Sequence, residues 1–168
     1  MLTRSDPARA EQMLGHLIQY LRHSLPRQHD EPSTLGAELE RALAYLEILK
    51  IRMGARLDVQ VDVPEPLRAT PLPAMMLQTL VENAIKHGLE PRTAGGTVWI
   101  RARRNEDEVA ITVADDGDGF NSKTSGSGIG LKNVRERLRL VYDGAASLAV
   151  IANFPTGVAA TIAVPGHA

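Results

Sequence analysis

The 168-residue sequence has no cysteine and few aromatic residues, which make up 4% of the chain. Without cysteine there is no disulfide framework and no thiolate metal site, and this composition fits a reducing, cytoplasmic compartment. The scarcity of aromatic rings argues against a base-stacking surface for nucleic acid. A formal net charge of −1 provides no electrostatic attraction to nucleic acid or anionic lipid.

Long apolar runs and a recognisable signal peptide are also absent. No segment approaches the roughly 20 apolar residues that cross a bilayer, so we expect no membrane segment in this chain. The hydrophobic fraction of 43% is nevertheless sufficient for a buried core. The length predicts one domain, or one domain with a short helical extension.

Two helices are predicted at the N-terminal end. The first covers residues 7–25, ends before Pro26 and has one apolar face, formed by Ala10, Met13, Leu14, Leu17, Ile18 and Leu21. The second runs from a Ser33 N-cap to about residue 56. Its apolar residues repeat in steps of four and three, as in a helix-packing seam: Leu35, Leu39, Ala42, Leu46, Leu49 and Met53. This seam could face the core of its own domain or a second subunit.

The rest of the chain mixes strands and helices. Alternating apolar residues predict strands at 57–63, 97–103, 108–114, 146–152 and 158–164. Helices are predicted at 77–88, where Pro73 suits the first turn, and at 131–141, with Val134, Leu138 and Val141 facing inward. This order predicts an α+β fold: a two-layer sandwich with helices on one face of a mixed β-sheet, preceded by a helical extension.

The predicted helix over residues 77–88, LQTLVENAIKHG, carries more polar chemistry than a solvated surface needs. Its apolar stripe consists of Leu77, Leu80, Val81, Ala84 and Ile85. The other face carries Thr79, Glu82, Asn83 and Lys86. The Asn83 amide oxygen can bind Mg²⁺, Lys86 can neutralise a phosphate oxygen, and Glu82 can orient a water molecule or act as a base.

A carboxylate, Asp115, follows directly after the predicted strand 108–114. If it is buried it needs donors, and the amino group of adenine is one, whereas guanine offers an acceptor there. Gly117 and Gly119 would let the backbone approach a flat ring. The same DDGDG segment also fits a tight surface turn.

A second glycine cluster, Gly126, Gly128 and Gly130, leads into the helix expected to begin near Leu131. Free backbone N–H groups at a helix N-terminus, with glycines before it, favour an anion. The pattern is neither a dinucleotide fingerprint nor a Walker loop, because no strand–turn–helix unit and no Gly-Lys-Ser/Thr accompany it. The small polar residues between the two clusters suit a lid over phosphates.

The order of VENAIKHG, DDGDG and GSGIGL resembles the N, G1 and G2 boxes of the Bergerat (GHKL) ATP-binding fold, which histidine kinases share with DNA gyrase, Hsp90 and MutL. The resemblance covers roughly residues 58–165. LQTLVENAIKHG followed by GIGLKNVRERLRLVY resembles the LytS-type sensor histidine kinases in particular. The segment ELERALAYLEILKIRMGARL is similar to the helix that precedes their ATP domain.

The resemblance implies a site for ATP and Mg²⁺. Asn83 would hold Mg²⁺, Lys86 and His87 would lie near phosphates, and Asp115 would read adenine, with Glu82, Asn83 and Lys86 as the catalytic group. The residues that would shape the pocket and its lid are Gly117, Gly119, Gly126, Gly128, Gly130 and Leu131. Gly157 matches the last glycine box.

Three departures from the family pattern stand out. Thr79 occupies the place of the water-activating glutamate of gyrase and Hsp90, which argues against that branch. Asp116 replaces a common asparagine and would add negative charge near phosphate. The phosphoacceptor segment, a histidine followed by Phe-Leu-Phe-Asn, is absent, and we expect it upstream of residue 1; none of the five histidines has that context.

The expected function is therefore the ATP-binding catalytic part of a two-component sensor histidine kinase, acting on a histidine outside this chain. Residues 1–56 would end the dimerisation and phosphoacceptor region, and residues 57–168 would form the catalytic domain. Expected partners are a response regulator, the upstream sensor part, which would anchor the protein if it is membrane-bound, and a second copy bound through the N-terminal helices. Two alternatives remain: an anti-sigma-factor-like serine kinase, and a regulatory module that binds nucleotide without transfer.

Overall fold

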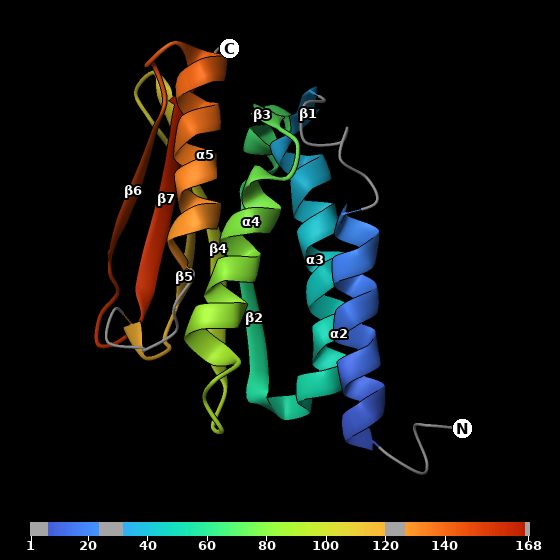
Figure 1. The fold of residues 1–168 in the computed structure, drawn as a ribbon. Helices are drawn as coiled ribbons and strands as arrows, with labels where there is room; N and C mark the ends of the chain where they lie inside the picture. Colours follow the sequence, from blue (N-terminus) through green and yellow to red (C-terminus); the bar gives the residue numbers. More distant parts are fainter. Residues whose placement is uncertain (1–6, 24–31, 120–126, 167–168) are drawn as a thin grey trace.

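The structure, a computed structural model, describes residues 7–23, 32–119 and 127–166. Its main feature is a five-stranded sheet with three helices against one face, and a fourth helix lies outside them (Figure 1). The predicted α+β sandwich with helices on one face is confirmed. The element order also agrees with the prediction, apart from the short elements described below.

The sheet is mixed, as the sequence predicts. Its strands lie in the order β2 (Leu57–Asp62), β4 (Gly96–Asn105), β5 (Glu108–Asp115), β7 (Val158–Pro165) and β6 (Ser147–Ala152). Only β2 and β4 run parallel, and the other neighbours are antiparallel. The β4–β5 hairpin turns at Glu106 and Asp107, so Asn105, expected in the turn, belongs to β4.

The helical layer consists of α3 (Leu35–Met53), α4 (Met76–Asn83) and α5 (Ser127–Tyr142), and α2 (Pro7–His23) lies beside α3 (Figure 1). α4 continues directly into η4 (Ala84–Leu89), a turn of π-helix. Two short 3₁₀ segments, η2 (Gly54–Arg56) and η3 (Glu65–Ala69), connect α3 to β2 and β2 to the next strand. The expected helix over 77–88 is therefore α-helical only as far as Asn83.

A small second sheet, not predicted from the sequence, precedes α3. It pairs β1 (Pro32–Thr34) with β3 (Pro71–Pro73) in antiparallel register. Two predictions are wrong as a result. Thr34 rather than Ser33 is the N-cap of α3, since its hydroxyl accepts from the Ala37 N–H at 3.2 Å. Pro73 lies in β3, opposite Pro32, rather than in the first turn of α4.

The apolar seam of α3 belongs to the core of its own domain. All six predicted seam residues are buried in one cluster with α4, α5 and the sheet. The expected apolar stripe of α4, from Leu77 to Ile85, is buried in the same cluster. Of the two alternatives for the seam, packing within the chain is therefore the one observed, because no part of the stripe is left for a second subunit.

The apolar face of α2, unlike that of α3, is largely exposed. Met13, Leu14 and Leu17 are 57%, 37% and 53% exposed, so this part of the predicted apolar face points away from the core. Ile18 of the same face lines the groove beside α3 and η4, together with the polar residues Glu11, Gln12 and His16. In α5, Val134 and Leu138 are buried as expected.

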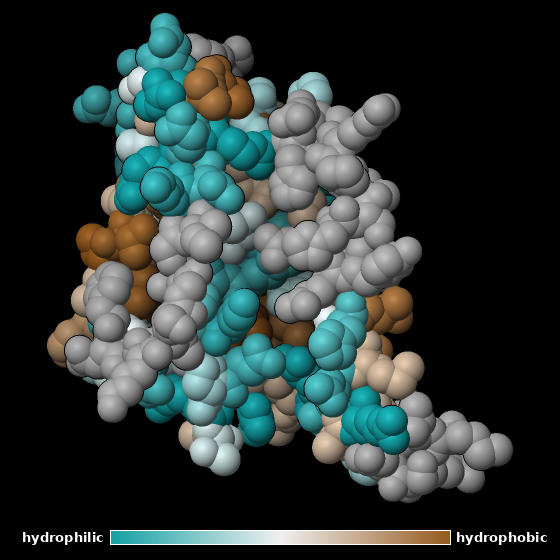
Figure 2. Space-filling model, viewed as in Figure 1, coloured by the Kyte–Doolittle hydropathy of each residue, from teal (hydrophilic) through white to brown (hydrophobic). Residues whose placement is uncertain are grey.

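The prediction for Val141 is wrong, since its side chain is 57% exposed. The next residue, Tyr142, packs against the core in its place. The view in Figure 2 shows a mainly hydrophilic surface on which hydrophobic side chains form small separate patches. In the described part of the chain, no helix combines the length and hydrophobicity needed to span a membrane.

Candidate functional site

The site is built around Asp115, the last residue of β5, whose side chain is 3% exposed. Its Oδ1 accepts a hydrogen bond from the Gly117 N–H at 2.9 Å, and the Val158 N–H also donates to the carboxylate. Burial raises the pKa of this carboxyl group, and the two backbone donors oppose that rise. A carboxylate has more acceptor positions than these two donors use, so it can still accept from a ligand N–H group.

Three glycines pack directly around Asp115. A Cβ on Gly88 would lie 2.7 Å from the Asp115 Cγ, and one on Gly117 would lie 2.1 Å from the Gly88 carbonyl oxygen. At Gly157, which has a φ of 102°, a Cβ would lie 1.9 Å from the Asp115 carbonyl oxygen. The loop after β5, the end of η4 and the turn before β7 therefore meet in a contact that admits no side chain.

Gly88 is a site residue that the sequence analysis missed. A glycine near the end of a predicted helix is normally explained as a helix terminator, so nothing in the sequence indicated a partner for it. The close backbone approach expected at Gly117 does occur, and its partner in the chain is Gly88. These two glycines bring the end of η4 against the loop that carries Asp115.

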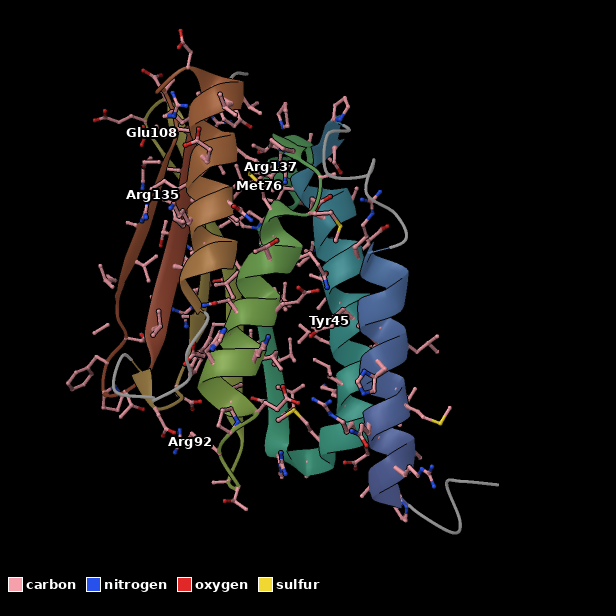
Figure 3. The ribbon with its side chains drawn as sticks, in the orientation of Figure 1. Tyr45, Met76, Arg92, Glu108, Arg135 and Arg137 are labelled. Atoms are coloured by element: carbon pink, nitrogen blue, oxygen red, sulfur yellow. The ribbon has the colours of Figure 1, made fainter. Side chains whose placement is uncertain are left out.

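Several polar side chains bind the backbone of the loop that carries Asp115 and Asp116. Asn153 Nδ2 donates to the Asp115 carbonyl at 2.9 Å, and the Thr156 hydroxyl donates to the Asp116 carbonyl at 3.0 Å. Arg92, at the end of the helical layer in Figure 3, donates to the same Asp116 carbonyl. None of these contacts had a sequence signal, because each joins residues at least 24 positions apart.

The carboxylate of Asp116 is bound to the start of β4. Its Oδ1 accepts from the Thr97 N–H at 2.8 Å, and a Cβ on Gly96 would lie 2.2 Å from that oxygen. The charge that the sequence leads us to expect near phosphate thus has a backbone donor at Thr97, the second residue of β4, and fixes the start of that strand.

The polar face of α4 is shared between two neighbouring helices. Thr79 lies toward α5, since a Cβ on Gly130 would be 3.5 Å from the Thr79 methyl group. Asn83 is half-buried and one turn further along, so it faces the same side. Thr79 directs its hydroxyl to the Met75 carbonyl at 2.9 Å, within its own helix.

Glu82 and Lys86 lie on the other side of that face. They line a groove of about 620 Å³ between α2, α3 and η4, opposite Tyr45, Arg52 and His16. Glu82 Oε1 accepts from Gln78 Nε2 at 3.1 Å. The four polar residues predicted on one face thus divide into an α5 side and an α3 side.

His87 lies in the π-turn and is half-buried. Burial, and then the charge of Lys86, lower the pKa of its imidazole, so the neutral ring predominates near pH 7. Its Nδ1 is buried and has no hydrogen-bond partner among the residues that the structure describes. π-Turns occur often at functional sites, and this one presents a ring nitrogen that a ligand or water molecule can satisfy.

The second glycine cluster lies mostly within α5. The helix begins at Ser127, before the expected start at Leu131, so Gly128 and Gly130 are in its first turns and Leu131 packs against the core. The first four N–H groups of a helix have no intrahelical acceptor. Gly119 has a φ of 71° at the other end of the loop. Gly126 lies outside the described residues.

Asn83 carries a half-buried amide oxygen, a neutral oxygen donor of the kind that a hard cation can use. Within the described part of the chain, no group of three or more His, Cys, Asp or Glu side chains could hold one. A cation at Asn83 would therefore take one amide oxygen from the protein and complete its shell with water and phosphate oxygens. Mg²⁺ usually keeps several water ligands and binds through few protein groups together with substrate phosphates.

Two family models match the chain. The model described as "Histidine kinase-, DNA gyrase B-, and HSP90-like ATPase" matches residues 70–166, more than half of the chain, and includes α4, Asp115 and α5. The chain belongs to this family. Its domain is therefore an ATP-binding domain. The second model, described as "Histidine kinase", matches residues 1–57.

Sensor kinases are among the most similar relatives. The sensor histidine kinase BtsS of Escherichia coli K12 is 38% identical over 136 residues, which cover 81% of this chain and 24% of that protein. The sensor protein LytS of Oceanobacillus iheyensis is 32% identical over 151 residues, covering 82% and 26%. The chain thus spans about a quarter of the length of the curated relatives it matches.

Solved structures show the same fold. The catalytic domain of histidine kinase ThkA matches with a TM-score of 0.61 at 17% identity, over 81% of this chain and 95% of that one. The histidine kinase domain of the blue-light-activated kinase from Erythrobacter litoralis EL346 matches with a TM-score of 0.56 at 23% identity, over 79% and 61%.

Proposed function

We propose that this chain is the ATP-binding catalytic part of a two-component sensor histidine kinase, and that it transfers the γ-phosphate of ATP to a histidine outside this chain. The observation that carries the proposal is the buried carboxylate of Asp115, held by backbone N–H groups and packed against Gly88. A single desolvated acceptor at the base of a site suits the adenine amino group.

In this proposal each wall has one task. Asp115 accepts a hydrogen bond from adenine, and Gly117 and Gly119 shape the loop beside the ring. Asn83 holds Mg²⁺, which supplies charge neutralisation on the phosphates when it is bound. Lys86 and His87, in η4, lie near phosphate oxygens in this proposal. Gly126, Gly128, Gly130 and Leu131 provide the lid and the N–H groups at the start of α5.

Transfer to a side chain is favoured over hydrolysis at such a site. Phosphoryl transfer depends mainly on in-line placement of the nucleophile and on charge neutralisation. The Thr79 hydroxyl, in the position of a water-activating glutamate, donates to the Met75 carbonyl. It has no carboxylate with which to take a proton from water. Glu82 lines the groove beside α2 and α3. In this proposal it orients the incoming histidine.

The test is incubation with γ-labelled ATP, using the chain alone and the chain extended by the residues encoded upstream. The expected result is ATP binding and slow hydrolysis by the chain alone, with acid-labile, base-stable label only on the extended protein. Label on His16 would place the acceptor in α2. Acid-stable label on a serine would support the serine-kinase alternative, and binding without any transfer would support a regulatory module.

A second copy of the chain is the proposed partner of α2. The exposed residues Met13, Leu14 and Leu17 form an apolar strip that none of the described residues covers, and packing against the same strip of another copy would bury both. The α3 seam is excluded from this role because the chain buries it. Light scattering should show a dimer that dissociates when Met13 and Leu17 are replaced by serine.

Further proposals concern the whole protein. A response regulator is the proposed recipient of the phosphate; a histidine kinase of similar fold, ThkA, was solved in complex with the response regulator TrrA, with a TM-score of 0.57. Use of ATP suggests a cytoplasmic location, or the cytoplasmic part of an anchored sensor. We also propose residues 1–56 as the helical region and 57–168 as the catalytic domain, with α3 packed into the core of the latter.

A further inference from the structure

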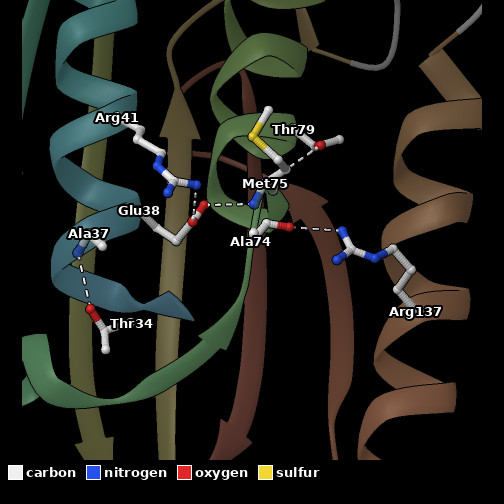
Figure 4. A network of polar contacts seen from close by, with 8 residues as sticks. All are labelled: Thr34, Ala37, Glu38, Arg41, Ala74, Met75, Thr79 and Arg137. Atoms are coloured by element: carbon white, nitrogen blue, oxygen red, sulfur yellow. Dashed lines mark hydrogen bonds and ion pairs between the residues drawn. The ribbon is translucent and has the colours of Figure 1, made fainter. Parts of the chain in front are cut away.

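The start of α4 lacks the usual helix cap (Figure 4). The helix begins after Met75, whose φ of 71° and ψ of 0° are left-handed, a conformation that non-glycine residues rarely adopt. A typical N-cap is Ser, Thr, Asp or Asn, with a side chain that accepts from the first turn. Met75 makes no such bond, and the first turn of α4 has no acidic residue. The helix start therefore depends on groups from other elements.

Glu38 of α3 is the first of these groups. Its side chain is fully buried, and its Oε2 accepts from the Met75 N–H at 2.8 Å. Its Oε1 lies 3.5 Å from Arg41 Nη1. A buried carboxylate is costly without donors, and negative charge is favourable at a helix N-terminus. Glu38 thus provides α4 with the acceptor and charge that its own first turn lacks.

Arg137 of α5 is the second group. Its Nη1 donates to the Ala74 carbonyl at 3.0 Å, and Figure 3 shows it beside Met76 at the start of α4. The Thr79 N–H and hydroxyl both donate to the Met75 carbonyl, at 3.0 and 2.9 Å, and close the first helical turn. Ala74 and Met75 are thus held by side chains of opposite charge, Arg137 from α5 and Glu38 from α3 (Figure 4).

We propose that Glu38 and Arg137 are positioning residues of the nucleotide site. The proposal rests on the proposed function, which assigns Asn83 to the metal and the start of α5 to the phosphates. A rise of 1.5 Å per residue puts Asn83 about 12 Å from Met75 along a continuous helix, so a rotation at Met75 moves Asn83 with it. Arg137 is about two turns after Gly130, so the same contact sets the spacing of α4 and α5. Because Glu38 lies on α3, a movement of α3 reaches both walls of the site.

The test compares Glu38→Gln and Arg137→Met with Glu40→Gln, which removes the same charge from an exposed position of α3. Backbone amide NMR shifts of the nucleotide-free protein are expected to change at Thr79 and Asn83 in the first two variants only. Calorimetry with ADP and Mg²⁺, at a temperature where all variants are folded, should show about tenfold weaker binding in both and no change in the control. The double variant should lose less than the product of the single effects, because both act on one turn.

The two readouts separate positioning from simple stabilisation. If neither the Asn83 amide shift nor the ADP affinity changes in Glu38→Gln and Arg137→Met, the proposal is overturned. A lower melting temperature in these variants would then show only that the two side chains stabilise the fold. If the unaltered chain binds no nucleotide, the proposed function fails, and the amide shifts still decide the positioning role. If Glu38→Gln does not fold, Arg137→Met decides the question, since its side chain is only half-buried.

Discussion

The surroundings of Asp115 and the outer face of α2 show two opposite kinds of packing. Around Asp115, three glycines leave no space for an added Cβ, and backbone N–H groups, Asn153 and Arg92 hold the loop. On α2, three large apolar side chains remain exposed. A carboxylate that must be held at a fixed position needs rigid, tightly packed surroundings. An exposed apolar strip, in contrast, is stabilised when a partner buries it. Substitutions in each of the two regions can test this contrast.

Gly157→Ala should have the largest effect on stability. The new Cβ would meet the Asp115 carbonyl in a backbone with φ of 102°, so strain and overpacking together should cost roughly 3 kcal/mol or more. The matched control is Gly144→Ala, where φ is 84° and nothing lies within 4 Å of the Cβ. The control should lose about 1 kcal/mol from strain alone. Equal losses in urea unfolding would show that the packing around Asp115 is not tight.

Asp115→Asn should weaken ATP binding by about ten- to hundredfold while the protein stays folded. The variant loses a charge-assisted hydrogen bond of about 1.5–3 kcal/mol to adenine, and its amide can present N–H instead of an acceptor. Calorimetry measures the change, and Asp107→Asn in the β4–β5 turn is the control. Binding equal to that of the unaltered chain would remove Asp115 from the adenine site.

The effect of Asp115→Asn on the free energy of unfolding should also depend on pH. Burial raises the Asp115 pKa in the folded state, so folding favours the protonated form. The stability contributed by this group is present below its unfolded pKa and is lost as pH rises through the folded value. The free energy of unfolding of Asp115→Asn, relative to the unaltered chain, should therefore increase from about pH 4 upward and then level off. A decrease over that range would show that donors, rather than burial, dominate.

Asn83→Ala should change metal dependence more than stability. The amide is half-buried and faces α5, and its loss removes the protein ligand proposed for Mg²⁺. ADP affinity measured with and without Mg²⁺ should become nearly equal in the variant, and Asn105→Ala should retain the dependence of the unaltered chain. If Asn83→Ala retains it too, the metal is bound elsewhere.

Replacement of Met13 and Leu17 by serine should have the smallest effect on the site. The strip lies on the outer face of α2, away from Asp115, so ADP affinity should stay within about twofold while the dimer dissociates. A large loss of affinity would contradict the contrast from which these predictions start, because it would couple α2 to the nucleotide site.

The fold could be predicted where the signal is local. Alternation of apolar residues located all five strands of the main sheet, and helical periodicity located α2, α3, α4 and α5, because each pattern records which side of an element is buried. The errors lie at element ends and in the small β1–β3 sheet, which was not predicted. Thr34 replaces Ser33 as N-cap because the β1–β3 pairing ends the strand at Thr34, and that pairing joins segments 37 or more residues apart.

The candidate site divides in the same way. Asp115, Asn83 and the glycines were predicted as site residues from residue type and order, and their roles toward nucleotide stay predictions. The sequence alone thus provided the strand and helix pattern and a set of candidate groups for nucleotide. The tertiary structure decided that Gly88 packs on Asp115, that Asp116 binds the start of β4, and that Glu38 and Arg137 hold the start of α4. These outcomes depend on contacts between residues far apart in the chain. A periodic pattern does not show which distant residue will donate to a buried charge, or which backbone will pack against a glycine.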